Sequence, residues 1–382
     1  MGGLHPLRAL RRTARTAAAA AEEGAVRLAA SRVPSPATPP SEPRSLFVLR
    51  NNDIGDLLVI TPLFEALRRR FPAAWIAAGV GDWSREVLRG NPHLSEVLPI
   101  NAPWFNKYHA QAGLPGRLAY LRSSPEVRTL AERGFEIGID VLGSVWGSLL
   151  LLQARVPYRL GVRGYAGGHS AVQAAVEFDS HEHVGRSALR FAELLGAQDL
   201  PPPRPQIFLT SGEREAAERW WAAAGAAGRR VVIAPGGGLA AKRWPAEHFG
   251  VVAAGLPGAS ILALGGPREE ALVAAVVAAA PAAAPAVRSF PEPPSLREVF
   301  ALVAAADLVV ANSSMVLHAA AAFGKRTLVP LGESFPSALQ HQEQWGYPGL
   351  SRSFGKEPGH RANVYTPGEI LAIVREEIGD LR

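Results

Sequence analysis

An acidic side chain stands at the start of a predicted helix, directly after a glycine. Asp56 follows Gly55, behind an apolar run at 46–49 and the turn-forming residues 51–53. The apolar run is typical of a strand buried on both faces of a parallel sheet, and apolar residues recur at helical spacing from Leu57. Ligands bind at the carboxyl edge of such sheets, so Asp56 is a candidate general base in a cleft. A carboxylate that only caps the helix is the alternative.

A second group of polar residues follows the strand predicted at 229–234. A glycine-rich loop at 235–238, which includes Gly236 and Gly237, leads to Lys242 and Arg243, and Pro245 suits the first turn of the next helix. Backbone amides, cations and a helix N-terminus are the groups that a diphosphate needs. We therefore predict a phosphate site here, with a solvated basic turn as the alternative.

The same loop also fits the glycine pattern of dinucleotide-binding proteins, through Gly236, Gly238 and Ala241. That pattern expects an acidic residue about twenty positions further on, at the end of the next strand, to hold a ribose. The next predicted strand, 260–264, ends in a Gly-Gly-Pro sequence at 265–267 and offers no acid there. The sequence therefore favours a nucleoside diphosphate over a dinucleotide.

A third group of polar residues follows a strand predicted at 307–311. Asn312, Ser313 and Ser314 come directly after this strand, and His318 lies in the Ala-rich helix that comes next. Hydroxyl groups and helix-start amides can bind a phosphate or a ribose. A histidine on an apolar helix is ordinarily a core residue with its hydrogen bonds satisfied, and this remains the alternative for His318.

Amphipathic side chains gather in the irregular segment 101–122. Lys107, Tyr108 and Arg117 are separated there by Pro and Gly residues. Because loops of this kind carry binding residues, we expect these three side chains to contact a sugar or a phosphate. They are equally compatible with packing beneath a loop.

Three motifs resemble, in the same order, the signatures of glycosyltransferase family 9, which includes the lipopolysaccharide heptosyltransferases. They are Gly-Asp-Leu-Leu-Val-Ile-Thr-Pro at 55–62, Pro-Gly followed by Lys-Arg-Trp-Pro at 235–245, and Asn-Ser-Ser-Met-Val-Leu-His at 312–318. The resemblance implies an α/β fold of GT-B type. In this fold two Rossmann-like, doubly wound domains face each other across an interdomain cleft that holds the active site.

The resemblance also implies inverting, metal-independent transfer of a heptose or related sugar. The implied donor is a nucleotide-diphosphate sugar, ADP-linked, and the implied acceptor is a saccharide or glycolipid such as lipopolysaccharide core or another cell-envelope glycan. Asp56 would take a proton from the acceptor hydroxyl, and Lys242 would stabilise the departing diphosphate. The other residues implied at the donor site are Gly55, Gly236, Gly237, Arg243, Trp244, Asn312, Ser313, Ser314 and His318. For such a transferase, Lys107, Tyr108 and Arg117 are the candidate acceptor residues.

The third motif departs from the family pattern at two positions. Aligned on His318, Ser313 and Met315 stand where the family usually has Asp and Gly. This departure leaves the donor sugar and its base open. It also motivates an alternative function, a catalytically silent module that binds a nucleotide sugar.

The alternation of strand and helix patterns divides the chain of 382 residues into two domains. We expect an N-terminal, acceptor-side domain at 45–200 and a C-terminal, donor-binding domain at 206–365, with a Pro-rich break between them. A capping box at its start predicts a final helix at 366–382, which we expect to pack back on the first domain.

The first 44 residues have a composition of their own. They hold seven Arg and three Glu, a net charge of +4 out of the total of +6, and become Pro-rich from 33 to 43. We expect a basic, disordered extension and linker. A weak amphipathic helix near the N-terminus, resting on an anionic membrane surface, is the alternative. The expected location is the cytoplasm, with peripheral contact at the inner face of the cell membrane.

Composition limits the remaining chemistry. The absence of Cys excludes disulfides, thiol nucleophiles and Cys-ligated metals. His181 and His183 flank Glu182, but two His at this spacing form a weak metal motif, and we prefer a helix start after Ser180. We therefore expect no metal and no cofactor. Only four of the 40 basic residues are Lys, and the others are Arg. This preference for Arg reflects genome composition, so we expect no nucleic-acid partner.

Overall fold

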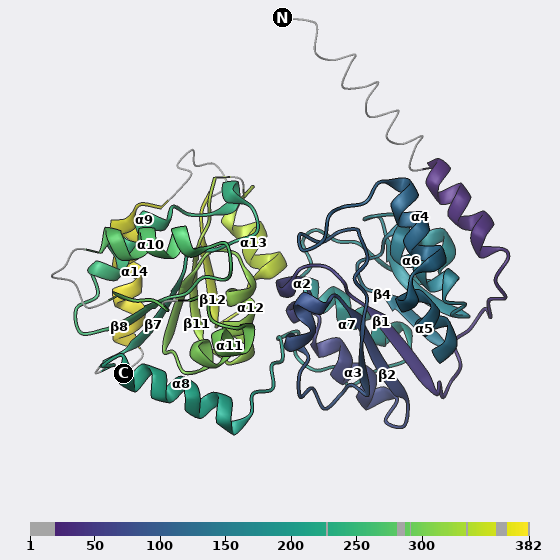
Figure 1. Ribbon diagram of the computed structural model, residues 1–382, viewed down its shortest axis with the longest axis horizontal. Helices are drawn as coiled ribbons and strands as arrows, with labels where there is room; N and C mark the ends of the chain where they lie inside the picture. Colours follow the sequence, from purple (N-terminus) through teal and green to yellow (C-terminus); the bar gives the residue numbers. More distant parts are fainter. Residues whose placement is uncertain are drawn as a thin grey trace, which may run out of the picture.

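The computed structural model describes residues 20–226, 228–280, 287–290, 292–333, 335–356 and 365–380. They form two lobes, each built around a parallel sheet with helices packed against it (Figure 1). Among these residues, every helix is too short or too polar to cross a bilayer.

The first sheet has the strand order β3-β2-β1-β4-β5-β6, and every pair is parallel. Its strands are β1(Ser45–Leu49), β2(Trp75–Val80), β3(Glu96–Pro99), β4(Ile137–Asp140), β5(Tyr158–Arg163) and β6(Ala174–Glu177). The apolar run of β1 is buried on both faces: Leu46 and Val48 join one hydrophobic cluster, and Phe47 and Leu49 join another. This explains why the strand reads as continuously apolar.

Helices cover both faces of the first sheet. On one face α3(Pro62–Arg70) packs against α7(Val184–Leu194), and on the other α4(Leu114–Ser123), α5(Pro125–Arg133) and α6(Val145–Gln153) pack together. The short α2(Ile54–Val59) follows β1, and two 3₁₀ turns, Asp82–Val87 and His169–Ala171, complete the domain.

The second sheet repeats this arrangement, in the order β12-β11-β10-β7-β8-β9. Its strands are β7(Arg230–Ala234), β8(Ser260–Ala263), β9(Val287–Arg288), β10(Leu308–Ala311), β11(Arg326–Pro330) and β12(Ser351–Phe354). Its helices are α8(Ser211–Ala223), α9(Ala246–Ala254), α10(Glu270–Ala279), α11(Leu296–Ala304), α12(Met315–Ala322), α13(Ala338–Trp345) and α14(Pro367–Asp380), with a 3₁₀ turn at Ala240–Lys242.

In the first sheet β1 lies between β2 and β4, and in the second sheet β7 lies between β8 and β10. The order of the strands therefore reverses beside β1 and beside β7. The two switch points are β1/β4 and β7/β10, where the connections leave in opposite directions and a crevice opens at the carboxyl ends. The predicted fold class, two facing Rossmann-like domains, is confirmed.

The domains meet through the helices that follow the two switch-point strands, α2 and α12 (Figure 1). A Cβ atom at Gly55 would lie 3.2 Å from His318 Cδ2 and 3.4 Å from Met315 Cα. Gly55 therefore permits the close approach of α12. The apolar core is continuous here, because residues of α2, α11 and α12 belong to one hydrophobic cluster.

The last helix, α14, packs on the second domain. Its buried residues Ile370 and Val374 join the cluster around Phe249, and Arg375 donates to the carbonyl of Gly255 at 2.8 Å. Figure 1 shows α14 beside α9, away from the first domain. The sequence-based expectation that this helix returns to the first domain is therefore wrong, because an apolar helix face does not specify which domain it covers.

Residues 20–44 are ordered against the first domain. Residues 20–30 are helical, and Val26 is buried against Leu152 and Ala171. Glu23 accepts a hydrogen bond from the Ser170 amide at 3.1 Å, and Arg159 donates to Ser35 Oγ at 2.8 Å. The expectation of a disordered extension therefore fails for this part of the chain. The amphipathic helix considered for the N-terminus lies in 1–19, outside the described residues.

Candidate active site between the domains

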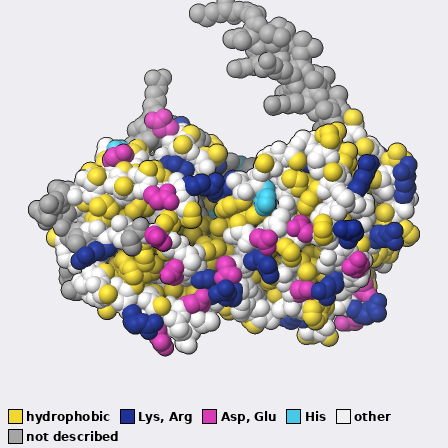
Figure 2. Space-filling model, in the orientation of Figure 1, with side chains coloured by type: hydrophobic (Ala, Val, Ile, Leu, Met, Phe, Trp, Pro, Cys, Tyr) yellow, Lys and Arg dark blue, Asp and Glu magenta, His cyan; other side chains and the backbone are white. Residues whose placement is uncertain are grey.

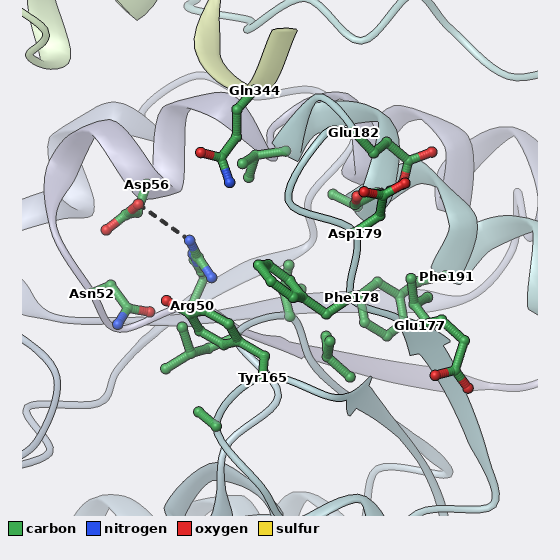
Figure 3. A pocket seen from close by; sticks show the side chains of 18 of the residues that line it. Arg50, Asn52, Asp56, Tyr165, Glu177, Phe178, Asp179, Glu182, Phe191 and Gln344 are labelled. Atoms are coloured by element: carbon green, nitrogen blue, oxygen red, sulfur yellow. Dashed lines mark hydrogen bonds and ion pairs between the residues drawn. The ribbon is translucent and has the colours of Figure 1, made fainter. Parts of the chain in front are cut away.

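Asp56 stands in the first turn of α2, at the carboxyl edge of the first sheet. Arg50, directly after β1, reaches it with a distance of 3.3 Å between Nη2 and Oδ1. Arg50 is almost fully buried, whereas the Asp56 side chain is 30% exposed (Figure 3). The buried guanidinium holds the carboxylate in place at the edge of a cavity, which is the position that a general base requires.

The cavity beside Asp56 has a volume of about 420 Å³ and lies mainly in the first domain. Arg50, Asn52 and Asp56 form its polar end, and Gln344 and Trp345 of α13 reach it from the second domain (Figure 3). The remainder of its wall comes from β5, β6, α7 and the loops beside them; these residues are Phe105, Val141, Leu142, Val162, Tyr165, Ala166, Val176, Glu177, Phe178, Asp179, Glu182, Val184, Ser187, Ala188 and Phe191.

Two buried polar atoms at this end of the cavity have no hydrogen-bond partner among the described residues. They are Arg50 Nε and Asn52 Oδ1. Buried polar groups are nearly always paired in native proteins. Both atoms are closed to solvent in this structure, so a ligand hydroxyl would pair with them only after a shift of these side chains.

The glycine-rich loop lies at the switch point of the second sheet, after β7. Arg243 donates to the carbonyl of Gly237 through Nε at 2.9 Å and Nη2 at 2.7 Å. Asn312 donates to the carbonyl of Pro235 at 2.6 Å and accepts from the amide of Trp244 at 2.7 Å. Arg243 and Asn312 therefore hold the loop in shape.

Trp244 is a core residue. Its side chain is completely buried, and its indole Nε1 donates to the carbonyl of Tyr365 at 2.9 Å. It packs edge-on against Phe249, with ring centroids 4.9 Å apart. The Trp244 side chain anchors the chain between the loop and α9. The sequence predicts contact with the donor, but a completely buried side chain in this position supports the loop instead.

Glu269 is a loop residue that the sequence analysis missed. Its carboxylate accepts from the amide of Gly237 at 3.1 Å and from the amide of Gly266 at 2.9 Å. A Cβ atom at Gly236 would lie 2.3 Å from its Oε2, so Gly236 leaves the space that the carboxylate fills. No acid stands at the end of β8 itself, as expected from the sequence. Glu269 lies six residues beyond that end, and nothing in its sequence position indicates its contact with the glycine-rich loop.

Lys242 is the exposed cation of this loop. Its Nζ lies 5.2 Å from the centroid of the Phe335 ring, and its backbone carbonyl accepts from the amide of Gly332 at 3.2 Å. Within the described ranges no carboxylate forms an ion pair with it. A compact ammonium without an acidic partner, beside a glycine-rich loop, is suited to binding phosphate oxygens.

The serines after β10 have structural partners. Ser314 caps α12 by accepting from the amide of Val316 at 3.4 Å. Ser313 Oγ lies 2.7 Å from Nε2 of the buried His341. His318 is buried, and its Nδ1 lies 2.6 Å from the Tyr347 hydroxyl. The alternative given for His318, a satisfied core histidine, therefore describes its surroundings well.

Replacing Asn312 by Ala is expected to destabilise the protein. The change leaves the Trp244 amide and the Pro235 carbonyl without their buried partner, at a cost of about 1–3 kcal/mol for each. Urea denaturation measures the effect, and Lys242→Ala is the matched control from the same loop, because the Lys242 side chain is exposed. A free energy of unfolding within about 0.5 kcal/mol of wild type would contradict the supporting role of Asn312.

Two buried histidines, His318 and His341, and the partly buried His183 lie at or near the domain interface. Burial lowers the pKa of His183 to about 4, of His318 to about 3 and of His341 to about 4. His183, from the first domain, packs edge-on against Tyr347 of the second, with centroids 5.1 Å apart. The described residues contain no cluster of His, Asp or Glu arranged to hold a metal ion.

These histidines predict an acid-sensitive fold. Each is neutral in the native protein, whereas the unfolded chain takes up a proton as the pH falls below about 6.5. The free energy of unfolding is therefore expected to fall between pH 6.5 and 5.0 by about 1.4 kcal/mol per pH unit for each histidine. Glu213, whose pKa is lowered to about 2 chiefly by Arg297, titrates below this window.

Urea denaturation at pH 7.5, 6.0 and 5.0 checks this expectation. His341→Gln, which removes one titrating group, is expected to reduce the slope by about a third. A free energy of unfolding that stays constant from pH 7.5 to 5.0 would show that the buried histidines are not neutral in the native state.

The three candidate acceptor residues lie apart from the cavity. Lys107 Nζ is 3.4 Å from Asp53 Oδ2 and 3.8 Å from the Cβ position of Gly238, so it reaches the glycine-rich loop from the first domain. Tyr108 stacks on Trp83, with centroids 5.0 Å apart. Arg117 lies over Trp146 and donates to the carbonyl of Ala112. The cavity next to Asp56 is lined by other side chains.

Comparisons with known proteins bear on the family and the fold. The model of glycosyltransferase family 9 (heptosyltransferase) matches residues 126–339. Lipopolysaccharide heptosyltransferase 2 of Salmonella typhimurium is 24% identical over 302 residues, covering 76% of this chain and 83% of that protein.

Two solved structures share the fold. A glycosyltransferase family 9 protein from Veillonella parvula has a TM-score of 0.72 at 18% identity, covering 90% of this chain and 100% of that one. Escherichia coli ADP-heptose lipopolysaccharide heptosyltransferase II has a TM-score of 0.68 at 22% identity, covering 88% and 99%.

Proposed function

The chain belongs to glycosyltransferase family 9, and from this premise we propose that it is an inverting, metal-independent glycosyltransferase. It moves a heptose or related sugar from a nucleotide-diphosphate sugar to a saccharide or glycolipid acceptor. An ADP-linked donor is the first choice, because a relative of the same fold is named for ADP-heptose. Lipopolysaccharide core or another cell-envelope glycan is the corresponding acceptor. The transfer reaction takes place in the cytoplasm, at the inner face of the membrane.

One observation supports the proposal: the contact of α2 with α12 joins the switch points of the two sheets. At the first switch point Arg50 holds the Asp56 carboxylate in place, and at the second lies the glycine-rich loop with Lys242. Asp56 would remove the proton of the acceptor hydroxyl as it attacks the anomeric carbon. Lys242 would meet the charge that develops on the departing diphosphate, from the opposite side of the sugar. The Gly237 amide would join it once the diphosphate displaces Glu269, to which that amide donates.

The donor residues divide into two groups under this proposal. Lys242 is the direct ligand of the diphosphate. Arg243, Trp244 and Asn312 act through the shape of the loop, since their side chains are already bonded to the protein. Lys107 reaches Gly238 of the glycine-rich loop. Under this proposal it is therefore a second cation that binds the donor phosphates, and it does not bind the acceptor.

A thermal-unfolding panel with ADP, GDP, UDP, CMP and NADH tests the proposal. A ligand at a hundred times its dissociation constant adds about 2.7 kcal/mol of stability, which is readily measured. We expect one nucleoside diphosphate to raise the melting temperature. Stabilisation by NADH alone would overturn the proposal in favour of a dehydrogenase.

A second candidate function is a catalytically silent module that binds a nucleotide sugar. It is motivated by Ser313, which stands in place of a carboxylate and is bonded to His341, and by Met315, which stands in place of a glycine. Both functions predict binding of the nucleotide. Only the enzyme releases nucleoside diphosphate from the donor when an acceptor is present, so measured turnover decides between them.

A further inference from the structure

Beyond the polar groups next to Asp56, apolar and aromatic side chains make up most of the cavity wall. Tyr165 and Phe178 form a ring pair with centroids 4.8 Å apart, and their side chains are 57% and 43% exposed. Figure 3 shows both rings in the cavity that Asp56 and Arg50 border, with Phe191 further along its wall. Figure 2 shows hydrophobic side chains gathered in the hollow between the two lobes. Exposed aromatic rings in a concave site offer stacking surfaces to a ligand.

The cavity has little positive charge to offer. Among the described residues that line it, Arg50 is the only Lys or Arg, and it is already paired with Asp56. Three further carboxylates line the wall: Glu177, Asp179 and Glu182. An anionic group in this cavity would meet these acids without a free cation to compensate for its desolvation.

Two of these acids are neutralised from outside the cavity. Glu177 pairs with Arg163 at 2.6 Å, and Glu182 pairs with Arg190 at 2.6 Å. Asp179 accepts from the amide of His181 at 2.8 Å, which leaves its charge in place. The side chains of the wall therefore disfavour phosphate and carboxylate groups, and they tolerate an uncharged ligand.

The polar end of the cavity fits one sugar ring. Arg50 Nε and Asn52 Oδ1 are unpartnered, both side chains are more than nine-tenths buried, and both residues line the cavity with Asp56. Once a side-chain shift opens these two atoms to the cavity, a sugar hydroxyl would accept from Arg50 Nε and donate to Asn52 Oδ1. A sugar held in this way has its reacting hydroxyl beside the Asp56 carboxylate and the rest of its molecule beside Tyr165 and Phe178.

From these observations we propose that the acceptor is an uncharged glycoside with an apolar aglycone. Its sugar lies against Arg50, Asn52 and Asp56, and its aglycone, an aromatic ring or alkyl chain, lies against Tyr165 and Phe178. The inference rests on the proposed transferase function. Among saccharide and glycolipid acceptors it selects neutral glycosides with an apolar aglycone, in place of lipopolysaccharide core. It excludes an acceptor that carries phosphate or carboxylate groups on or next to the reacting sugar.

The test compares four probes on the full chain: phenyl, octyl and methyl β-D-glucoside, and glucose 6-phosphate. Saturation-transfer NMR and competition titrations give their relative affinities, with the nucleoside diphosphate from the unfolding panel present. We expect the phenyl and octyl glucosides to bind about tenfold more tightly than the methyl glucoside. Glucose 6-phosphate is expected to bind more weakly than methyl glucoside. Equal affinities, or preference for the phosphate, would overturn the inference.

Two variants assign the preference to the cavity wall. Phe178→Ala and Tyr165→Ala, both at exposed side chains, are expected to reduce the advantage of the phenyl glucoside to about threefold or less. The matched control is Trp75→Ala, which removes an exposed aromatic side chain at the amino end of β2, and it is expected to leave the advantage unchanged. An unchanged advantage in both cavity variants would overturn the inference.

The two proposals fail in different ways. If no nucleoside diphosphate stabilises the protein, the transferase function fails, whatever the glucosides do. If a nucleoside diphosphate stabilises it but the phenyl and octyl glucosides show no advantage, the acceptor inference fails and the transferase function stands.

Discussion

Replacing Asp56 with Asn is expected to lower the rate of sugar transfer by about 10²- to 10⁴-fold, the usual contribution of a general base. The amide has the same shape as the carboxylate, but it cannot take the proton of the acceptor hydroxyl. Its oxygen can still accept from Arg50, which lies 3.3 Å from Asp56 in the native protein. Affinity for the nucleoside diphosphate is therefore expected to stay within about twofold of wild type.

The rate of nucleoside diphosphate release, measured at saturating donor and acceptor, checks this prediction. Asp199→Asn is the matched control, because Asp199 is an exposed carboxylate paired with Arg69, away from the cavity. A variant at position 56 that keeps more than about a tenth of the wild-type rate would show that another group is the base.

Replacing Lys242 with Ala is expected to weaken binding of the nucleoside diphosphate by about 10- to 100-fold, the usual worth of a hydrogen bond to a charged group. The Lys242 ammonium has no acidic partner among the described residues, so its removal leaves no buried charge behind. Stability without ligand should therefore change little, which separates this variant from Asn312→Ala.

Titration calorimetry with the nucleoside diphosphate and the corresponding nucleoside checks this second prediction. The nucleoside has no phosphate, so its weak binding is expected to be the same in the variant and in wild type. Lys325→Ala is the control, because Lys325 lies just before β11, at the opposite edge of the same sheet. Unchanged diphosphate affinity in Lys242→Ala would remove the phosphate site from this loop.

The strands were largely predictable because parallel strands buried on both faces read as short apolar runs. The run at 46–49 became β1(Ser45–Leu49), and the strand predicted at 229–234 became β7(Arg230–Ala234). The positions of Asp56 and the glycine-rich loop followed, because both come directly after a first strand of a doubly wound sheet.

Side-chain partners within the site were not predictable in the same way. Arg243 and Trp244 have the residue types of ligand-binding groups, yet one is bonded to Gly237 and the other is buried in the core. Glu269 reaches Gly237 from a separate loop, and the Tyr165 and Phe178 pair forms between the loops that follow the neighbouring strands β5 and β6. Such contacts depend on tertiary packing, which local sequence patterns do not contain.

A crystal structure of the Asp56→Asn protein with an intact nucleotide sugar tests the central claim most directly. The account predicts that the diphosphate lies against the glycine-rich loop at hydrogen-bond distance from Lys242, and that the anomeric carbon faces residue 56 across the junction of α2 and α12. A nucleotide bound instead in the cavity beside Tyr165 and Phe178 would contradict it, because donor and acceptor would then have exchanged domains.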